Sequence, residues 1–380
     1  MFTEVTSNEL ILFFILYGIT GTVSAIAAIY LLLRRGNAFA PEVTPPVRLR
    51  RWAATFFAVS ALAHVWWYLF YVYSCDINSV AYVTVVVLDC ATQLVTIAGM
   101  LLAMLQDRRR PVWPAFAAMI PLVVLGVLQA LYPKGPFENI AGIYILSFYL
   151  LFSIYMVFAV RQYGRWLNDN YADLEHKKVW LTQMVSLGCL LLFILYSLSD
   201  INNILIYVLH FVELVLFILL LWRVETLPQL ETILVEKENS PPTSEKSSEP
   251  DADKTDVGNF LNINLVQIEE MLSKNCVDTQ LYLQHDLTLQ QLAHSIGTNR
   301  SYLSHYFARQ GITYNIYINN LRINHFISRY QEAASTGQAF TVQQLASESG
   351  YHSYSTFSLA FKQRFGQNVT EWMRDAGDKQ

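Results

Sequence analysis

Seven continuously apolar stretches occupy the first part of this chain, and each is about as long as a membrane-spanning helix. A bilayer core needs roughly 20 mostly apolar residues in a helix. Only helices and closed barrels can span lipid, and continuous rather than alternating apolar runs indicate helices. The stretches lie at about residues 10–33, 52–73, 80–105, 112–132, 140–162, 179–199 and 201–222. The sequence therefore predicts a seven-helix transmembrane bundle over residues 1–222.

Basic residues gather in every second loop between these stretches. The first, third and fifth loops hold, in order, Arg34, Arg35, Arg48, Arg50 and Arg51; Arg108, Arg109 and Arg110; and Arg161, Arg165, Lys177 and Lys178. Loops 74–79 and 199–202 hold none, and loop 133–139 holds only Lys134. Because Lys and Arg are enriched in cytoplasmic loops, we expect the N-terminus outside the cell and everything after Trp222 in the cytoplasm.

Ionisable side chains inside the apolar stretches are candidates for a functional site, since they are costly in lipid. They are His64, Asp89, His210 and Glu213, and Gln93 lies one helical turn after Asp89. His210 and Glu213 share a helix face. Two interpretations stay open. The residues form a polar pocket that senses an unknown small-molecule or ionic signal, or an interhelical hydrogen-bond network that fixes packing.

The sequence lacks the common catalytic and metal-binding motifs. The four cysteines lie far apart without a CxxC pair, which argues against a disulfide framework and a zinc site. The sequence has no HExxH motif, glycine-rich phosphate loop or nucleophile elbow. We therefore expect no enzyme, no cofactor and no metal.

Residues 223–258 predict a stalk and a linker. Leu227, Leu230 and Leu234 have helical spacing, so the last helix could continue as a dimerising stalk, but Pro228 would break or kink it. Residues 239–258 are rich in Pro, Ser and acidic residues, which is typical of a disordered segment. About 20 such residues span roughly 25 Å root-mean-square.

The last domain, residues 259–380, contains an internal repeat. TLQQLAHSIG at 288–297 matches TVQQLASESG at 341–350, with an offset of 53 residues. Each copy opens with a predicted capping box and ends at a glycine; the paired positions are Thr288 and Gln291, Thr341 and Gln344, and Gly297 and Gly350. A glycine turn that lets two helices cross closely is typical of a helix-turn-helix. The sequence thus predicts a soluble all-α domain with two helix-turn-helix units.

A single predicted helix joins the two copies. In residues 313–333 apolar side chains recur at helical spacing. A helix of about 20 residues is about 30 Å long. Two helix-turn-helix units joined in this way could enter successive major grooves, which are about 34 Å apart.

Residues 262–374, about 30% of the chain, resemble the AraC/XylS family of bacterial transcription regulators. The resemblance lies in LQQLAHSIGTNRSYLSHYF at 289–307, NNLRIN at 319–324 and QLASESGYHSYSTFSLAFKQRFG at 344–366. The family has one extra residue between turn glycine and closing phenylalanine in the second copy, as Gly297–Phe307 and Gly350–Phe361 have here. Val369 departs from the pattern, which usually has proline there. The membrane part resembles no named family.

The resemblance implies a set of DNA-binding residues. The implied base readers are Arg300, Ser301, Ser304 and His305 in the first unit and Ser353, Tyr354, Ser355 and Ser358 in the second, with Arg309, Arg322, Lys362 and Arg364 on phosphates. Residues 260–380 hold nine Lys or Arg and nine Asp or Glu, so no large basic surface is expected. Non-specific affinity should be weak, and a homodimer or membrane clustering would raise it.

Together these features predict a one-component regulator in the inner membrane of a bacterial cell. Its partners would be the lipid bilayer, double-stranded promoter DNA, and RNA polymerase for an activator. The alternative is a transporter or channel with an autoregulatory DNA-binding tail. The sequence shows no halved repeat and a single mid-span proline, Pro121, which disfavours the transporter.

Overall fold

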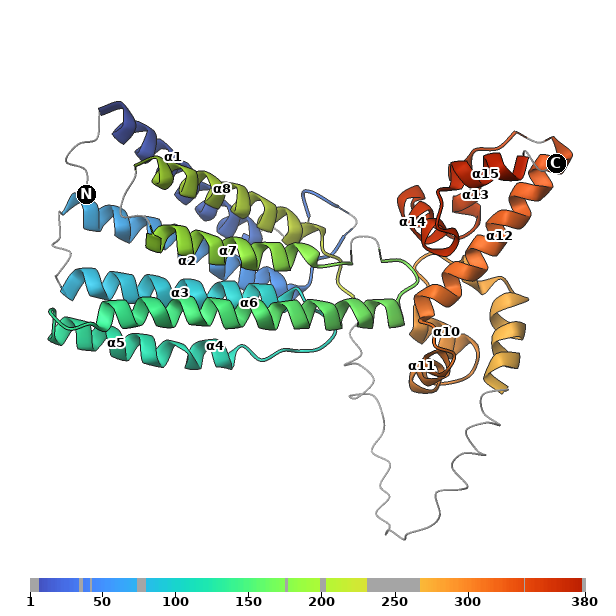
Figure 1. Ribbon diagram of the computed structural model, residues 1–380, viewed down its shortest axis with the longest axis horizontal. Coiled ribbons are helices and arrows are strands. Elements are labelled where there is room, and N and C mark those ends of the chain that lie inside the picture. Colours follow the sequence, from blue (N-terminus) through green and yellow to red (C-terminus); the bar gives the residue numbers. More distant parts are fainter. Residues whose placement is uncertain are drawn as a thin grey trace, which may run out of the picture. The chain divides into compact units, whose positions relative to one another are not determined.

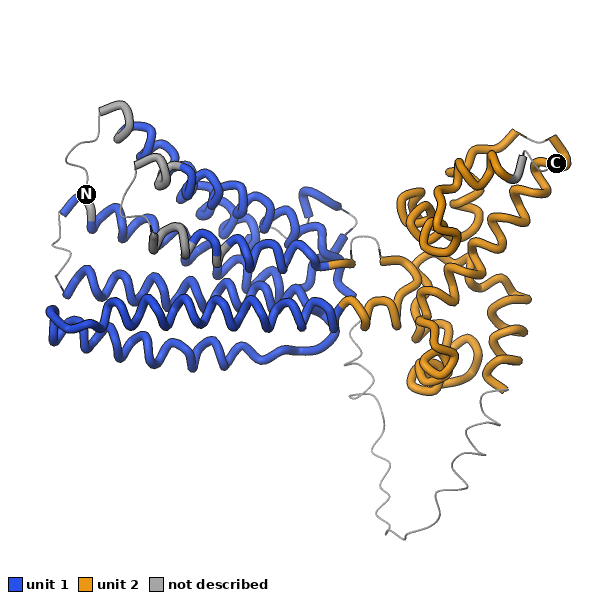
Figure 2. The backbone as a smooth tube through the Cα atoms, viewed as in Figure 1, with its two compact units in different colours: residues 1–163, 179–235 blue, residues 164–178, 236–380 orange. Residues whose placement is uncertain are grey.

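The computed structural model describes residues 7–33, 37–41, 43–73, 80–174, 177–198, 203–230, 267–337 and 339–377. These residues form helices and no strand, which confirms the predicted all-α class. The chain divides into two compact units (Figure 2). The first comprises residues 1–163 and 179–235, and the second comprises residues 164–178 and 236–380.

Helices of the first unit lie at the positions of the predicted spans (Figure 1). They are α1 (Ser7–Leu33), α2 (Val47–Val72), α3 (Val80–Ala103), α4 (Trp113–Ala117), α5 (Met119–Leu131), α6 (Phe137–Asn170), α7 (Trp180–Leu198) and α8 (Asn203–Thr226). The predicted fourth span is divided into α4 and α5 at Ala118. The cause is Pro121, which lacks the N–H that would bond to the carbonyl of Ala117.

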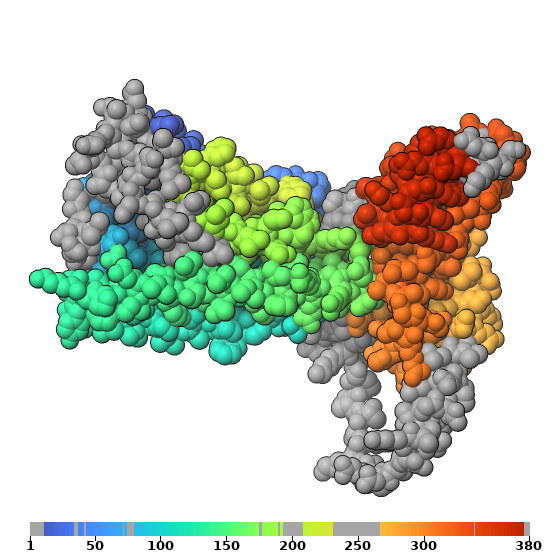
Figure 3. All heavy atoms as spheres, in the orientation of Figure 1, coloured from blue at the N-terminus to red at the C-terminus, as the bar shows by residue number. Residues whose placement is uncertain are grey.

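Five spans among the described residues are long and apolar enough to cross a membrane: α1, α2, α3, α4 with α5, and α6. The other two predicted spans are the helices α7 and α8, for which the crossing stays a prediction. Large apolar side chains face outward from the spans, among them Ile26, Ile120, Ile143 and Phe158. Figure 3 shows α6 open along one face of this unit. A surface of this kind suits lipid rather than water.

Close helix contacts define the interior of the first unit. A Cβ on Gly99 of α3 would overlap Cε3 of Trp52 on α2, so only glycine allows the ring to pack there. Near the end of α8, Glu225 is fully buried and accepts a 2.8 Å hydrogen bond from the hydroxyl of Tyr30 on α1. The end of the bundle at which α8 terminates is therefore held by specific polar contacts.

The proposed helical stalk does not continue from α8. The helix ends at Thr226, before Pro228, and Leu227 and Leu230 are buried in the first unit. Gln106 donates to the carbonyl of Pro228 and accepts from the N–H of Leu230, both at 2.9 Å. The prediction that Leu227 and Leu230 form part of a dimerising stalk is therefore wrong, because these side chains are already buried within one chain. Leu234 and the predicted linker 239–258 lie outside the described residues.

In the second unit the two predicted helix-turn-helix units flank one long helix (Figure 1). Its helices are α10 (Leu289–Ser295), α11 (Arg300–Arg309), α12 (Tyr314–Thr336), α13 (Val342–Glu348), α14 (Tyr354–Phe365) and α15 (Val369–Gly377), preceded by η2 (Ser273–Val277) and η3 (Leu281–Leu283). Each helix-turn-helix has its own apolar core, and α12 contributes Ile318 to the first and Phe326 to the second. The predicted joining helix is thus confirmed.

Residues 164–178 belong to the same compact unit as these helices. The boundary falls inside α6, after Tyr163, so the last turns of this 34-residue helix are part of the second unit. Ala172, just beyond the helix, is 1% exposed and lies in the first apolar core. Nothing in the sequence indicated that residues 164–178, inside the predicted domain 1–222, belong to the second unit.

Candidate functional site

The first helix-turn-helix begins at a complete capping box. The hydroxyl of Thr288 accepts from the N–H of Gln291, whose side chain accepts in turn from the N–H of Thr288. The turn passes through Gly297 at φ +75°. Asn299 then caps α11 by accepting from the N–H of Tyr302. Because the cap fixes where α11 starts, it also fixes which side chains face outward.

The second helix-turn-helix follows the same plan, with a turn that is one residue longer. Thr341 accepts from the N–H of Gln344, but the side chain of Gln344 donates to Glu348 instead of completing the box. The predicted second capping box is therefore only half formed. Gly350 adopts φ +86°, and a Cβ there would lie 2.7 Å from the carbonyl oxygen of Leu283. Glycine is required at this turn for both reasons.

The outward faces of α11 and α14 carry most of the predicted base readers. On α11, Leu303, Tyr306 and Phe307 are buried, which leaves Ser301 and His305 exposed and Ser304 half-buried. On α14, Tyr354 and Ser355 are exposed and Ser358 is half-buried, beside the 51% exposed Leu359. The hydroxyl of Ser353 caps α14 by accepting from the N–H of Thr356.

Residues 292–375, which span both units, match a protein-family model described as a helix-turn-helix domain. These residues form an AraC-type helix-turn-helix domain. The same comparisons found no match for the chain among curated proteins or solved structures. The AraC-type domain is a DNA-binding module, so the outward faces of α11 and α14 are its candidate nucleic-acid interface.

Three of the four predicted phosphate partners of the AraC-type domain are exposed cations. Arg309, Lys362 and Arg364 all face solvent, and Arg364 also donates to the carbonyl of Asn320 at 2.9 Å. Their exposed positions suit contacts with a DNA backbone.

Arg322, the fourth, has a different role. It is 1% exposed, and its guanidinium donates to the carbonyls of Tyr282 and Gln284, both at 2.7 Å. The prediction that Arg322 contacts phosphate is therefore wrong, because the side chain is buried inside the AraC-type domain. It ties α12 to the segment that precedes α10.

The predicted base reader Arg300 is bound by the last residue of α6. Its guanidinium donates two hydrogen bonds, from Nε at 2.8 Å and Nη2 at 2.6 Å, to Oδ1 of Asn170. Tyr171 forms a bridge with Thr288, and the side chain of Asn315 donates to the carbonyls of Tyr171 and Ala172 at 3.1 and 2.6 Å. The segment thus packs against the first helix-turn-helix.

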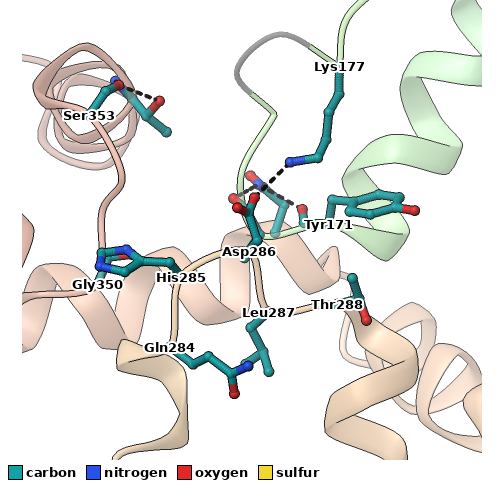
Figure 4. Close-up of polar contacts among 12 residues, drawn as sticks. Tyr171, Lys177, Gln284, His285, Asp286, Leu287, Thr288, Gly350 and Ser353 are labelled. Carbon is teal, nitrogen blue, oxygen red and sulfur yellow. Dashed lines mark hydrogen bonds and ion pairs between the residues drawn. The ribbon is translucent and has the colours of Figure 1, made fainter. Parts of the chain in front are cut away.

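An ion pair adds to this attachment (Figure 4). Nζ of Lys177 lies 2.9 Å from a carboxylate oxygen of Asp286. Burial opposes ionisation of Asp286, but Lys177, with help from His352 and Arg322, outweighs it and lowers the pKa of this carboxyl. The sequence contained no signal for these partners, because NDNYAD at 168–173 looks like any polar loop after an apolar helix.

The first unit brings three of the predicted intramembrane residues together. One ligand atom each of His64, His210 and Glu213 lies within 4.8 Å of the others. Tyr17 of α1, which sequence analysis missed, packs against both imidazoles, with ring centroids 4.7 Å from His64 and 5.6 Å from His210. This cluster lies among α1, α2 and α8.

The remaining predicted residues, Asp89 and Gln93, bond to α2. A carboxylate oxygen of Asp89 accepts from Nε1 of Trp67 at 2.9 Å, and Gln93 accepts from the hydroxyl of Ser60 at 3.2 Å. Ser60 also offers its carbonyl to Nδ1 of His64, at 2.8 Å. The polar side chains of three predicted spans are therefore connected through α2.

Proposed function

We propose that this protein is a membrane-bound one-component transcriptional regulator. The AraC-type domain lies in the bacterial cytoplasm and reads promoter DNA with α11 and α14. The transmembrane bundle perceives a signal through its intramembrane polar residues and thereby changes the availability of the AraC-type domain for DNA. A second chain or RNA polymerase would complete the promoter complex.

The bond between Arg300 and Asn170 is the observation that carries this proposal. Arg300 is the first residue of α11, and the N-terminal part of a recognition helix is what contacts base edges. Asn170 is the last residue of α6, a helix whose earlier part belongs to the bundle. DNA and the end of α6 therefore compete for Arg300 at the start of α11. A signal that alters α6 would shift the balance between the two states.

The charge of the loops supports the orientation. Residues 164–178 include the basic side chains Arg165, Lys177 and Lys178, and basic loops favour the cytoplasm. A reporter that is active only in the cytoplasm should therefore work when fused at loops 106–111 or 163–178 and fail at loop 133–139. Activity only in the last case would contradict the proposal, because the AraC-type domain would lie away from the chromosome.

The regulatory part of the proposal is tested by exchange of the bundle. Genome-wide mapping of the bound DNA gives a target promoter, and a reporter gene behind it gives the output. Residues 1–163 and 179–230 are replaced by an unrelated membrane domain of equal topology, with 164–178 retained. We expect DNA binding to persist and the response to the native signal to disappear. A response that survives the exchange would mean that the bundle is only an anchor.

A further inference from the structure

We propose that His64, His210 and Glu213 bind a divalent transition-metal ion, with Zn²⁺ as the reference ion. His64 is on α2, and His210 and Glu213 are on α8, so the ion would join two helices of the bundle. The inference rests on the proposed function only for its regulatory consequence, since it names the ligand whose binding is sensed.

The imidazole of His64 is prepared for a metal ion. A carbonyl oxygen can only accept, so the contact of Nδ1 with the carbonyl of Ser60 puts the ring proton on Nδ1. Nε2 then carries a bare lone pair, and it is buried without a hydrogen-bond partner. Buried acceptors in proteins nearly always have a partner. Metal-binding histidines commonly donate their other ring N–H to a backbone carbonyl, as His64 does.

His210 and Glu213 supply a second edge of the site. They are three residues apart on α8, and Nδ1 of His210 lies 3.3 Å from Oε2 of Glu213. Ligand atoms about 2.0–2.1 Å from a tetrahedral zinc ion lie about 3.3–3.4 Å from each other. This pair forms a hydrogen bond whose length also equals the spacing of two zinc ligands, so an ion could replace the shared proton without moving either side chain far. His64, within 4.8 Å of both, needs to approach by at most about 1.5 Å, which side-chain rotations provide.

Gly21 of α1 leaves the room that His64 occupies. A Cβ on Gly21 would lie 3.1 Å from Cβ and 3.2 Å from Cγ of His64. The backbone of α1 thus closes one side of the imidazole. Together with the ring of Tyr17, it limits the directions in which Nε2 can move.

The ligand set selects the class of ion. Two imidazoles and one carboxylate suit Zn²⁺ and its neighbours in the first transition row, whereas Mg²⁺ and Ca²⁺ prefer oxygen ligands. The carboxyl group of Glu213 supplies an anionic ligand, which offsets part of the charge of a divalent ion inside a membrane. Three protein ligands leave one coordination position for water, so the ion can exchange.

Metal titration of the full-length protein tests the site. The protein, purified without a histidine tag, is placed in lipid nanodiscs, stripped with a chelator and titrated with Zn²⁺ or Co²⁺. We expect about one ion per chain and the visible absorption of four-coordinate Co²⁺. His64→Ala, His210→Ala and Glu213→Gln should each weaken Zn²⁺ binding at least about 100-fold, since even partners beyond the ligands change affinity by 10–100-fold. The control His294→Ala removes an exposed imidazole and should change nothing.

Gly21→Ala adds a measurement that removes no ligand. It pushes on His64, so it should lower Zn²⁺ affinity while the stoichiometry stays the same. If a ligand variant fails to fold, the Zn²⁺ affinity of Gly21→Ala still tests whether His64 is a ligand. Absence of Zn²⁺ binding, or equal binding by all the variants, would overturn the metal site and leave the proposed regulator intact. Zinc binding at these residues without any effect on promoter output would instead keep the site and contradict the sensing role.

Discussion

Oδ1 of Asn170 accepts two hydrogen bonds from the guanidinium of Arg300, a residue 130 positions later in the chain. Asn170 ends α6, and Arg300 begins α11. The pair holds the implied base reader half-buried at the first residue of α11, the second helix of the first helix-turn-helix. Under the proposed function, the pair stabilises a state of the AraC-type domain that competes with DNA binding.

Asn170→Ala should release Arg300 and strengthen DNA binding by the full-length protein. Hydrogen bonds to a charged group contribute about 1.5–3 kcal/mol. The lower value corresponds to an increase of about tenfold in apparent affinity for the target promoter. Fluorescence anisotropy with labelled promoter DNA and protein in nanodiscs measures the change. Asn168→Ala is the matched control on the same helix and should bind like the wild type. Unchanged or weaker binding by Asn170→Ala would exclude the competition.

Local patterns in the sequence predicted the helices and both helix-turn-helix units. Capping by Thr288 and the turn at Gly297 depend on residues a few positions apart, so the sequence displays them directly. Gln344 shows the limit of such patterns. It has the same spacing as Gln291, yet its side chain bonds to Glu348, because an alternative partner lies one turn further along α13.

Contacts between distant segments could not be predicted in this way. Arg322 resembles a phosphate-binding arginine in sequence. Only the fold shows that its guanidinium donates hydrogen bonds to two carbonyls, 38 and 40 residues earlier in the chain. Asn170 is equally ordinary until α6 is seen to end beside α11. The predicted intramembrane residues were recognisable one by one, because charge in an apolar stretch is rare. Their grouping around Tyr17 required the packing of α1, α2 and α8.

Arg300→Ala and Lys362→Ala should weaken DNA binding in different ways. Loss of a bidentate base contact by Arg300 should cost about 1–3 kcal/mol at the specific site and relax one base position. Loss of Lys362 should weaken all sequences similarly and lower the salt dependence by about one phosphate contact. Binding to the promoter and to single-base variants, over a range of salt concentrations, separates the two. Equal loss on all sequences for Arg300→Ala would show that this residue reads no base.

Arg322→Ala should reduce stability rather than directly remove a DNA contact. The substitution leaves the buried carbonyl of Tyr282 without its partner, which costs about 1–3 kcal/mol, and also leaves a cavity. Hydrogen exchange of α10 and α12 in the full-length protein should therefore speed up. The exposed Lys362→Ala serves as control and should leave exchange unchanged. Normal exchange combined with a lower salt dependence of DNA binding would restore Arg322 as a phosphate partner.

Acidification should destabilise the second helix-turn-helix through His325. Burial and then the charge of Arg329 lower the pKa of His325 from 6.5, against the opposing effect of Glu348. The folded state thus binds its proton less readily than the unfolded state. Its stabilising contribution is complete above pH 6.5 and is lost as the pH falls from there through the folded pKa. Hydrogen exchange of α13 and α14 at about pH 7.5 and 5.5, corrected for intrinsic rates, measures this loss.

His325→Gln should remove much of that pH dependence, because glutamine does not titrate. His294→Gln is the control, since His294 is exposed in the first helix-turn-helix. If His325→Gln retained the full dependence, another group would have to be responsible.

Gly350→Ala should be far more harmful than Gly297→Ala, although both glycines have positive φ. An L-residue in that conformation costs roughly 1–2 kcal/mol at either position. At Gly297 nothing lies within 4 Å of an added Cβ, so the cost ends there. At Gly350 the new methyl group would lie 2.7 Å from the carbonyl oxygen and 2.8 Å from Cα of Leu283. Backbone atoms cannot rotate away as a side chain would, so the turn and the segment before α10 must separate.

The separation also breaks the contact between Nδ1 of His285 and the carbonyl of Gly350, which is 3.2 Å long. We expect Gly350→Ala to lower the melting temperature of the AraC-type domain by at least about 10 °C more than Gly297→Ala, since 1 kcal/mol corresponds to about 4–8 °C in a domain of this size. The comparison uses thermal unfolding of both full-length variants, monitored by the protease susceptibility of residues 267–377 at each temperature. Equal melting temperatures would mean that Leu283 does not pack against the second turn, and that the two helix-turn-helix units are joined by α12 alone.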